Sequence, residues 1–481
     1  MLATTLATTL AASMAIVTQD QASLRASPRD SAQQQAVLWQ GDVLEIRGER
    51  MDYLQVYDHR RERAGYVLAA QVRTTSALPT EAPELLSVLR FVRDTPGAEA
   101  LGIAYAAAYL KAVPAGAMTA EPFDALGTLA DRLARRASSR QGKANDATLA
   151  AHLEGVAPYG VKMFSYERDG AMQICYDGDA FRRVLAMPSA SAEQRARAAL
   201  GLTRHECIDP ALQPLARFQF DQWRAEVLDR VETGTLPQTL KNRLRLRQAG
   251  VWAALAYAQT RRPDASAAEV QGAGERAVQA LAAIDKAELS DADLLDYSQA
   301  AMRAGASRWA AEPPLKPAGR LALVTQLGAP GETCVLLTDT QHGAARPLLR
   351  RCTYATVWPA SASVSPDGQA LALAVQPLAT WRELWIFRRD AQAEAGWVVD
   401  VLPPAASGPE LGYAEFAGWV PGGERFLLVR ESRVEGRSQR SFEVVRRDTL
   451  ATEKQASRPE LLVLFGRWQD PVWKRLSLSL R

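Results

Sequence analysis

The stretch QQAVLWQGDVLEIRGERMDYLQVYDHRRERAGYVLAAQVR, residues 34–73, decides the fold of the first part of the chain. Apolar residues recur in it with a period close to two, as in VLEI at 43–46 and YLQV at 53–56. This alternation is typical of half-buried β-strands, and we expect turns at 48–50 and 59–61. Together with the strand-like AIVTQDQASLRASP ahead of it, the pattern predicts a small all-β barrel over residues 16–75.

Three short elements occur in order within this region: LRA before a proline at 24–26, LxxGDxL at 38–44 and GYV at 65–67. Together they resemble a bacterial SH3-like domain, and the resemblance covers residues 16–75 of the 481. It implies peptidoglycan or a peptide as the ligand.

The aromatic residues of this region are the best candidates for a binding site. Flat rings flanked by charged groups supply contact area at low entropic cost. The alternative is that most of them fill the barrel and its rim. The candidate ligand-binding residues are Trp39, Tyr53, Tyr57, Tyr66, Asp52 and Arg25.

After the linker LPTEAP at 78–83, apolar residues recur with a period near 3.6, which predicts a helical domain over 84–310. Paired helices with short joints suit either an α-solenoid or a compact bundle. The stretch at 160–178 breaks the pattern and predicts a β-hairpin that turns at Asp169-Gly170. We expect Asp291 to cap the last helix, and Ser191 with Gln194 to form a capping box.

Beyond a second linker, EPPLKP at 312–317, the sequence is typical of β-structure. SVSPDGQALALAV and ELWIFRRD at 363–390 return as GWVPGGERFLLVRES and SFEVVRRD at 418–448. These units resemble the blades of Tol-type β-propellers, whose strands open on the same Ser-Pro-Asp-Gly turn. The resemblance implies three to four propeller-like blades over 318–481, with an exposed edge covered by the helical domain or another chain. The fold class is therefore multidomain: a small SH3-like barrel, an all-α middle domain and an all-β C-terminal domain.

The four cysteines indicate two disulfide bonds. Cys334 and Cys352 stand symmetrically about a turn at Gly343, so an antiparallel hairpin would place them opposite each other. Cys175 and Cys207 would then pair by elimination. Disulfides favour an oxidising compartment, whereas the alternative is four reduced thiols in a cytosolic protein.

The first 15 residues, MLATTLATTLAASMA, carry no charge and end in a small-x-small pattern, which predicts a cleaved signal peptide. A periplasmic or secreted protein follows from this. The alternatives are a start upstream or an uncleaved N-terminus in a cytoplasmic protein. The sequence holds no apolar run of 18 residues, so we expect no membrane span.

The charge balance, 57 Lys and Arg against 54 Asp and Glu, argues against a nucleic-acid partner. The basic run at 241–247 lies on a predicted helix, where its arginines form a solvated face. We find no Gly-x-Ser-x-Gly, Ser-x-x-Lys or glycine-rich phosphate loop, and therefore expect no cofactor and no enzyme of these classes. A zinc site at His205 and Cys207 lacks a second ligand pair, so we predict no metal.

These observations lead to two hypotheses. The first is a non-catalytic cell-envelope binding or scaffolding protein, in which the SH3-like module binds peptidoglycan or a peptide and the blades bind a protein partner. The second is an envelope enzyme with its site in the helical region around 160–210, where His205, Glu206 and Asp177 would have to converge. The sequence leaves the oligomeric state open.

Overall fold

The computed structural model describes residues 13–139, 146–168, 171–313, 321–406, 410–434, 437–471 and 473–474. Contacts between residues divide the chain into two compact units. Unit 1 runs to Leu212 and also includes Val231–Thr235, and unit 2 comprises Gln213–Arg230 and the chain from Leu236 onward. The division therefore falls inside the region predicted as one helical domain.

Unit 1 begins with an antiparallel seven-stranded sheet in the order β3-β2-β6-β5-β4-β1-β7. Its apolar residues gather into one core on one side of the sheet. The two edge strands of this sheet, β3 and β7, are not paired with each other. Hydrogen bonding therefore does not close the sheet into the barrel that we expected. The strands are β1 (Met14–Val17), β2 (Ala22–Arg25), β3 (Gln34–Leu38), β4 (Val43–Arg50), β5 (Tyr53–Asp58), β6 (Arg63–Leu68) and β7 (Val72–Thr75).

One local prediction in this region is wrong, and the predicted signal peptide stays a prediction. The first turn lies at Met51 and Asp52 rather than at 48–50, because β4 continues to Arg50 through a bulge between Ile46 and Gly48. Residues 1–12 of the predicted signal peptide lie outside the described residues, but Met14 and Ala15 form half of β1. Ala15 is completely buried, so cleavage after it would remove a core residue of the sheet.

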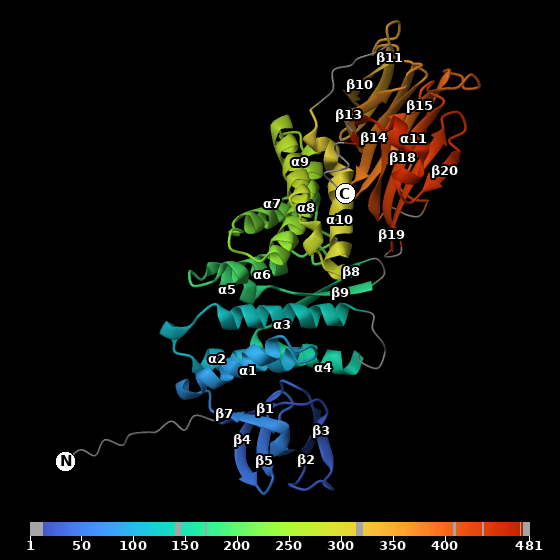
Figure 1. Cartoon of the computed structure of the whole chain (residues 1–481). Helices are drawn as coiled ribbons and strands as arrows, with labels where there is room; N and C mark the ends of the chain where they lie inside the picture. The colour runs from blue at the N-terminus through green and yellow to red at the C-terminus, as the bar shows by residue number, and fades with distance from the viewer. Residues whose placement is uncertain are drawn as a thin grey trace, which may run out of the picture. The chain divides into compact units, whose positions relative to one another are not determined.

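The rest of unit 1 consists of helices and one hairpin, and Figure 1 shows α3 between the layer of α1, α2 and α4 and the hairpin β8-β9. The hairpin that the sequence predicts is confirmed, although its turn at Asp169-Gly170 lies outside the described residues. The capping box of Ser191 and Gln194 is confirmed as well. The elements are α1 (Ala82–Arg93), α2 (Glu99–Ala112), α3 (Glu121–Ser138), α4 (Asp146–Val156), β8 (Met163–Arg168), β9 (Ala171–Tyr176), α5 (Asp179–Ala186) and α6 (Ala192–Leu202).

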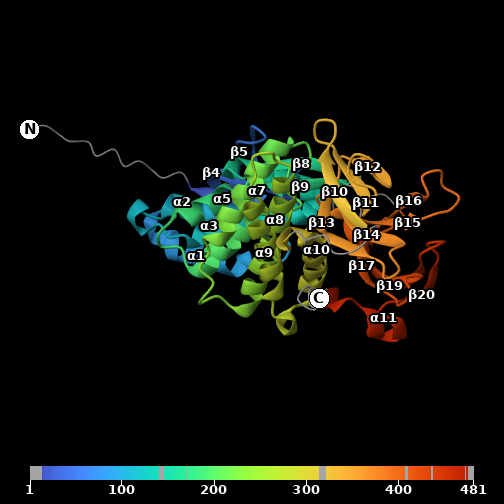
Figure 2. The same ribbon diagram turned by 90° about the horizontal axis from the view of Figure 1, so that it is seen from above.

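Unit 2 opens with four helices, of which α10 packs against α8 on one side and β17 on the other (Figure 2). Ser290 caps α10 through its hydroxyl, so the cap is one residue earlier than the predicted Asp291. Among the described residues, no helix has the length and apolar character needed to cross a membrane. The helices are α7 (Pro214–Asp229), α8 (Gln238–Thr260), α9 (Ala267–Ala282) and α10 (Asp291–Ser307).

The C-terminal part of unit 2 consists of β-sheet, as predicted. A three-stranded sheet, β10-β11-β12, precedes two successive four-stranded antiparallel meanders, β13–β16 and β17–β20, which join through a short parallel pairing of β15 with β17. A short helix, α11 (Val463–Trp468), follows. The strands are β10 (Leu321–Leu327), β11 (Thr333–Asp339), β12 (Leu349–Thr353), β13 (Thr356–Val364), β14 (Ala370–Leu378), β15 (Trp381–Arg389), β16 (Trp397–Leu402), β17 (Leu411–Trp419), β18 (Arg425–Val434), β19 (Arg437–Arg446) and β20 (Thr452–Ala456).

The Ser-Pro-Asp-Gly turn before β14 links the two meanders. Asp367 accepts hydrogen bonds from the Ser365 hydroxyl at 2.6 Å and the Gln369 amide at 3.1 Å. Its other carboxylate oxygen lies 2.5 Å from a guanidinium nitrogen of Arg447, in the turn after β19. Burial raises the pKa of Asp367, but the hydrogen bonds from Arg447 and Ser365 outweigh it and hold that pKa below its usual value.

Candidate functional site

The candidate site is one face of the N-terminal sheet. In β5, Leu54 and Val56 point into the core of the sheet. Because side chains alternate along a strand, Tyr53 and Tyr57 lie on the opposite face. Tyr66 of β6 is paired with Gln55, which lies between these two tyrosines on the same face of β5. Tyr66 therefore shares their face. We call Tyr53, Tyr57 and Tyr66 the tyrosine face.

Charged groups surround one end of the tyrosine face. The hydroxyl of Tyr53, a side chain that is 7% exposed, donates to the carboxylate of Asp30. This hydrogen bond raises the pKa of Tyr53, and the nearby Arg25 guanidinium opposes the shift. Arg25 is paired with Tyr66 across β2 and β6, and Asp52 lies exposed in the turn before Tyr53. The structure thus brings together four of the six predicted residues at this end.

A second charged cluster lies at Tyr57. The Arg47 guanidinium sits 4.1 Å above the centre of the Tyr57 ring, and the His59 ring meets it edge-on at 4.9 Å. Glu45, which is paired with Tyr57 across β4 and β5, lies 2.6 Å from Nε2 of His59. The hydrogen bond from His59 holds the pKa of Glu45 below its ordinary value. Tyr57 is therefore a half-buried ring with a cation on its face and the hydrogen-bonded pair of Glu45 and His59 beside it.

Trp39 lies elsewhere, in the turn where the sheet meets the helices of unit 1. Gly41 has a φ of +85°, and a Cβ there would stand 2.5 Å from the carbonyl oxygen of Ala100 in α2. The same glycine's carbonyl accepts a hydrogen bond from the Tyr159 hydroxyl. The backbone amide of Trp39 donates to the buried carboxylate of Asp42 at 3.1 Å. This turn holds the sheet on the helices, and the structure does not place Trp39 in register with the tyrosine face.

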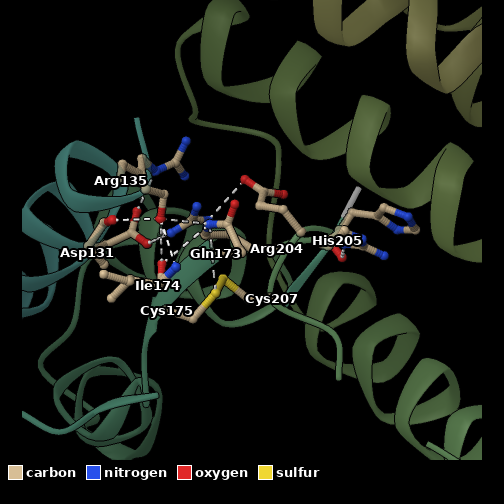
Figure 3. The surroundings of a disulfide bond; sticks show 12 residues. Asp131, Arg135, Gln173, Ile174, Cys175, Arg204, His205 and Cys207 are labelled. Atoms are coloured by element: carbon tan, nitrogen blue, oxygen red, sulfur yellow. Dashed lines mark hydrogen bonds and ion pairs between the residues drawn. A yellow bond between two sulfur atoms is a disulfide. The ribbon is translucent and has the colours of Figure 1, made fainter. Parts of the chain in front are cut away.

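The disulfide between Cys175 and Cys207 ties the end of β9 to the segment after α6, as predicted (Figure 3). Cys175 is completely buried. Next to the bridge, the buried Arg204 bonds Asp131 of α3 at 2.5 Å and Glu206 at 3.0 Å. These contacts give Arg204 and Glu206 a structural role, because they join the loop to the helix beneath it.

The residues of the enzyme hypothesis do not converge in one cavity. Figure 3 shows the His205 side chain directed away from Gln173 and the disulfide, while its backbone carbonyl accepts a hydrogen bond from Arg168 at 3.0 Å. Asp177 lines a cavity of about 380 Å³, and neither His205 nor Glu206 is among the described residues of its wall. The polar lining of that cavity is Tyr159, Lys162, Tyr176, Asp177, Asp179 and Arg183.

The second disulfide, between Cys334 and Cys352, is also confirmed, and the two residues face each other across β11 and β12. Glu332 lies near both sulfur atoms, and these three residues have the spacing of metal ligands. Thiolates bind metals, whereas these sulfur atoms are joined to each other. We therefore assign this group to the hairpin's cross-link rather than to a metal centre.

The sequence reasoning did not identify the charged partners of the tyrosines. Asp30 lies in the loop between β2 and β3, and its contact with Tyr53 spans 23 residues. Of these partners, Glu45 alone left a signal in the strand pattern, because it is the β4 residue that pairs with Tyr57. Arg47 lies at a bulge, and His59 follows the end of β5.

Comparisons of the chain with protein-family models, curated proteins and solved structures found no match.

Proposed function

We propose that this chain is a non-catalytic binding protein of the bacterial cell envelope, whose N-terminal sheet is an SH3-like module that binds peptidoglycan or a peptide. The observation that carries the proposal is the tyrosine face with its ring of charged partners. Half-exposed rings offer flat contact area to sugar rings and peptide groups. The adjoining Arg25, Asp52 and Glu45 offer hydrogen bonds to polar substituents.

Two features support an envelope location. Both pairs of cysteines form disulfides, which persist in oxidising compartments and are rare in the cytosol. The uncharged N-terminal stretch resembles a secretory signal, although the burial of Ala15 requires any cleavage to fall before β1.

We further propose that the two meanders, β13–β16 and β17–β20, are propeller-like blades that bind a protein partner. Each has the four antiparallel strands of a blade, and the contact between Asp367 and Arg447 joins the first turn of one meander to the last turn of the other. The strand β20 ends the sheet order, so its outer edge offers unpaired backbone groups to another strand.

Cosedimentation with purified peptidoglycan sacculi tests the binding function. Wild-type protein should be retained saturably, and the double variant Tyr57→Ala/Tyr66→Ala should bind at least about fivefold more weakly, since two ring contacts of about 0.5 kcal/mol or more are lost. The matched control is Phe91→Ala/Tyr354→Ala, because these rings are 76% and 60% exposed and lie on other elements.

Sacculi stripped of stem peptides by an amidase separate the two ligand classes. Retention on the bare glycan strands identifies the sugar chain as the ligand, and loss of retention identifies the peptide. Wild-type protein that is not retained on intact sacculi, or a double variant that is retained as well as the control, contradicts the proposal.

A further inference from the structure

The bridge between Cys334 and Cys352 lies on the face of the sheet β10-β11-β12 that is turned away from its core. Val335 and Leu337 of β11 belong to a core shared with strands β14 and β15. Because side chains alternate along a strand, Cys334 points to the opposite face, and so does Cys352, its partner in register. Cys334 is completely buried, whereas Cys352 is partly exposed in the edge strand β12. A reagent from solution therefore approaches the bridge on the side of Cys352.

A guanidinium group lies beside the buried sulfur atom. Nη2 of Arg350 donates to Sγ of Cys334 at 3.4 Å. Arg350 precedes Cys352 by two residues in β12, so it lies on the same face of the strand as the bridge. A positive charge next to a sulfur atom stabilises its thiolate form. Cys334 is thus placed to leave the bridge as a thiolate when Cys352 is attacked.

The other disulfide of the chain provides an internal comparison. There too one cysteine, Cys175, is completely buried, and its partner Cys207 is partly exposed. The side-chain nitrogen of Gln173, a neutral amide, lies 4.0 Å from Sγ of Cys175. The two bridges are therefore matched in burial, but the side-chain donor at the buried sulfur is charged in one and neutral in the other. Exchange is faster when the leaving sulfur is the more stable thiolate, so the bridge beside Arg350 should open first.

The carboxylate of Glu332 acts on the same bridge in the opposite direction. It lies within 4.8 Å of both sulfur atoms. One of its oxygens accepts a hydrogen bond from the backbone amide of Ala329 at 3.0 Å, which offsets part of its negative charge. The carboxylate repels an incoming thiolate, and it does so more strongly when the attacking molecule carries further negative charge. The bridge therefore favours reductants without additional anionic groups.

We propose that the Cys334–Cys352 bridge is a site of thiol–disulfide exchange whose substrate is a dithiol without anionic groups. One thiolate of the dithiol attacks Sγ of Cys352, and as the new S–S bond forms the bridge breaks and Cys334 leaves with the electron pair. The second thiolate of the dithiol then attacks its own mixed disulfide and releases Cys352 as a thiolate. The dithiol loses two electrons and becomes a disulfide, its two thiol protons pass to solvent, and the two cysteines are reduced. This inference does not depend on the tyrosine face.

Reduction of the native full-length protein by dithiothreitol tests this proposal. Free thiols are trapped with N-ethylmaleimide at set times, and peptide mass spectrometry follows each bridge separately. We expect the Cys334–Cys352 bridge to open at least about fivefold faster than the Cys175–Cys207 bridge. Equal rates, or faster opening of the Cys175–Cys207 bridge, overturn the proposal.

The variant Arg350→Gln tests the guanidinium, because it removes the charge and keeps a polar side chain. Its Cys334–Cys352 bridge should open about threefold more slowly, while the other bridge keeps its wild-type rate. The second bridge also reports on folding, since unfolding would expose and accelerate both. The matched control is Arg346→Gln, an exposed arginine of the same hairpin, which should react as wild type does. An Arg350→Gln variant that reacts as fast as wild type contradicts the proposed role of the guanidinium.

The variant Glu332→Gln tests the preference for reductants without anionic groups. With dithiothreitol, its Cys334–Cys352 bridge should open about twofold faster than that of wild type. With 2-mercaptoethanesulfonate, which carries a sulfonate, the acceleration should be larger because two negative charges no longer meet. An equal acceleration with both reagents contradicts this preference.

The monothiol 2-mercaptoethanol shows which sulfur atom is attacked. Its mixed disulfide with the protein should form on Cys352, because Cys334 is buried and leaves. A mixed disulfide on Cys334 overturns the proposed order of bond formation and bond breaking.

Discussion

The aromatic residues of the N-terminal sheet and those of the C-terminal meanders have different surroundings. Tyr57 and Tyr66 are half-exposed on a sheet whose core lies on the other face. Trp358, Trp381 and Trp385 are 6%, 3% and 3% exposed. Strand β14 lies between β13 and β15, the two strands that carry these tryptophans, and it is buried on both faces over most of its length.

The difference shows that the abundance of aromatic residues does not by itself mark a binding surface. Seven of the eleven tryptophans lie between residues 358 and 473, yet those of the first meander serve the core. The tyrosine face is less rich in aromatic residues, but Tyr57 and Tyr66 are partly exposed to solvent and lie beside charged groups, while Tyr53 is buried. The proposed binding surface therefore differs from the buried tryptophans both in its exposure and in its charged partners.

The largest expected effect is that of removing a meander tryptophan. Trp385→Ala should lower the free energy of unfolding by about 3–5 kcal/mol, because it opens a cavity in a packed core. Tyr66→Ala should lower the free energy of unfolding by less than about 1 kcal/mol, because the ring is already partly exposed to solvent. Urea denaturation of both variants measures the contrast, and similar losses in the two would refute the distinction between the two regions.

The two disulfides should stabilise their units to similar extents. The Cys175–Cys207 bridge closes 32 residues and the Cys334–Cys352 bridge closes 18. From the loop-closure entropy, we expect each double Cys→Ser variant to have a free energy of unfolding about 3–4 kcal/mol lower than wild type. The decrease should be about 0.5 kcal/mol larger for the bridge that closes the longer loop. Thermal unfolding followed by calorimetry checks this, and a variant as stable as wild type would contradict a structural role for that bridge.

The cation above Tyr57 allows a finer test of the tyrosine face. Arg47→Gln removes the cation from the ring but keeps a polar side chain in β4. We expect retention on sacculi to weaken about threefold, in line with a cation–π contact of about 0.5–1 kcal/mol, with an unchanged unfolding midpoint. Arg50→Gln, in the same strand but without a described ring contact, is the control. A threefold loss in both variants would assign the effect to net charge alone.

The smallest effect concerns the acid sensitivity of the contact between the meanders. The folded protein holds the pKa of Asp367 below its usual value, so the unfolded chain binds the proton more readily. The stabilisation is present above the unfolded pKa of about 3.9 and is lost as pH falls through the lower, folded pKa. Asp367→Asn should therefore be less stable than wild type at pH 7, with the difference shrinking towards pH 3. A constant difference across denaturation curves from pH 7 to pH 3 would contradict this linkage.

Much of the secondary structure is predictable from local pattern. The region 84–310, predicted to be helical, contains the helices α1 to α10, because apolar residues recur through it with a helical period. The pairing of Cys334 with Cys352 follows from the symmetry of one hairpin. By contrast, the bulge between Ile46 and Gly48 depends on how β4 twists against β5, and the alternation of apolar residues does not specify that twist.

The candidate site is predictable only in part. Strand alternation places Tyr53, Tyr57 and Tyr66 on one face, and the sequence analysis singled out all three. The strand pattern did not distinguish Trp39 from these tyrosines. Trp39 lies in the turn that contains Gly41, and the close contact of Gly41 with Ala100 joins segments far apart in the chain. The same limit applies to Asp30, whose importance depends on a partner distant in sequence.

The most direct test of the account is hydroxyl-radical footprinting of the protein free and bound to purified sacculi. Tyr57 and Tyr66 should become protected on binding, whereas Phe91 and Tyr354, exposed on other elements, should react as before. Retained protein in which the two tyrosines stay as reactive as in solution would contradict the tyrosine face as the binding surface.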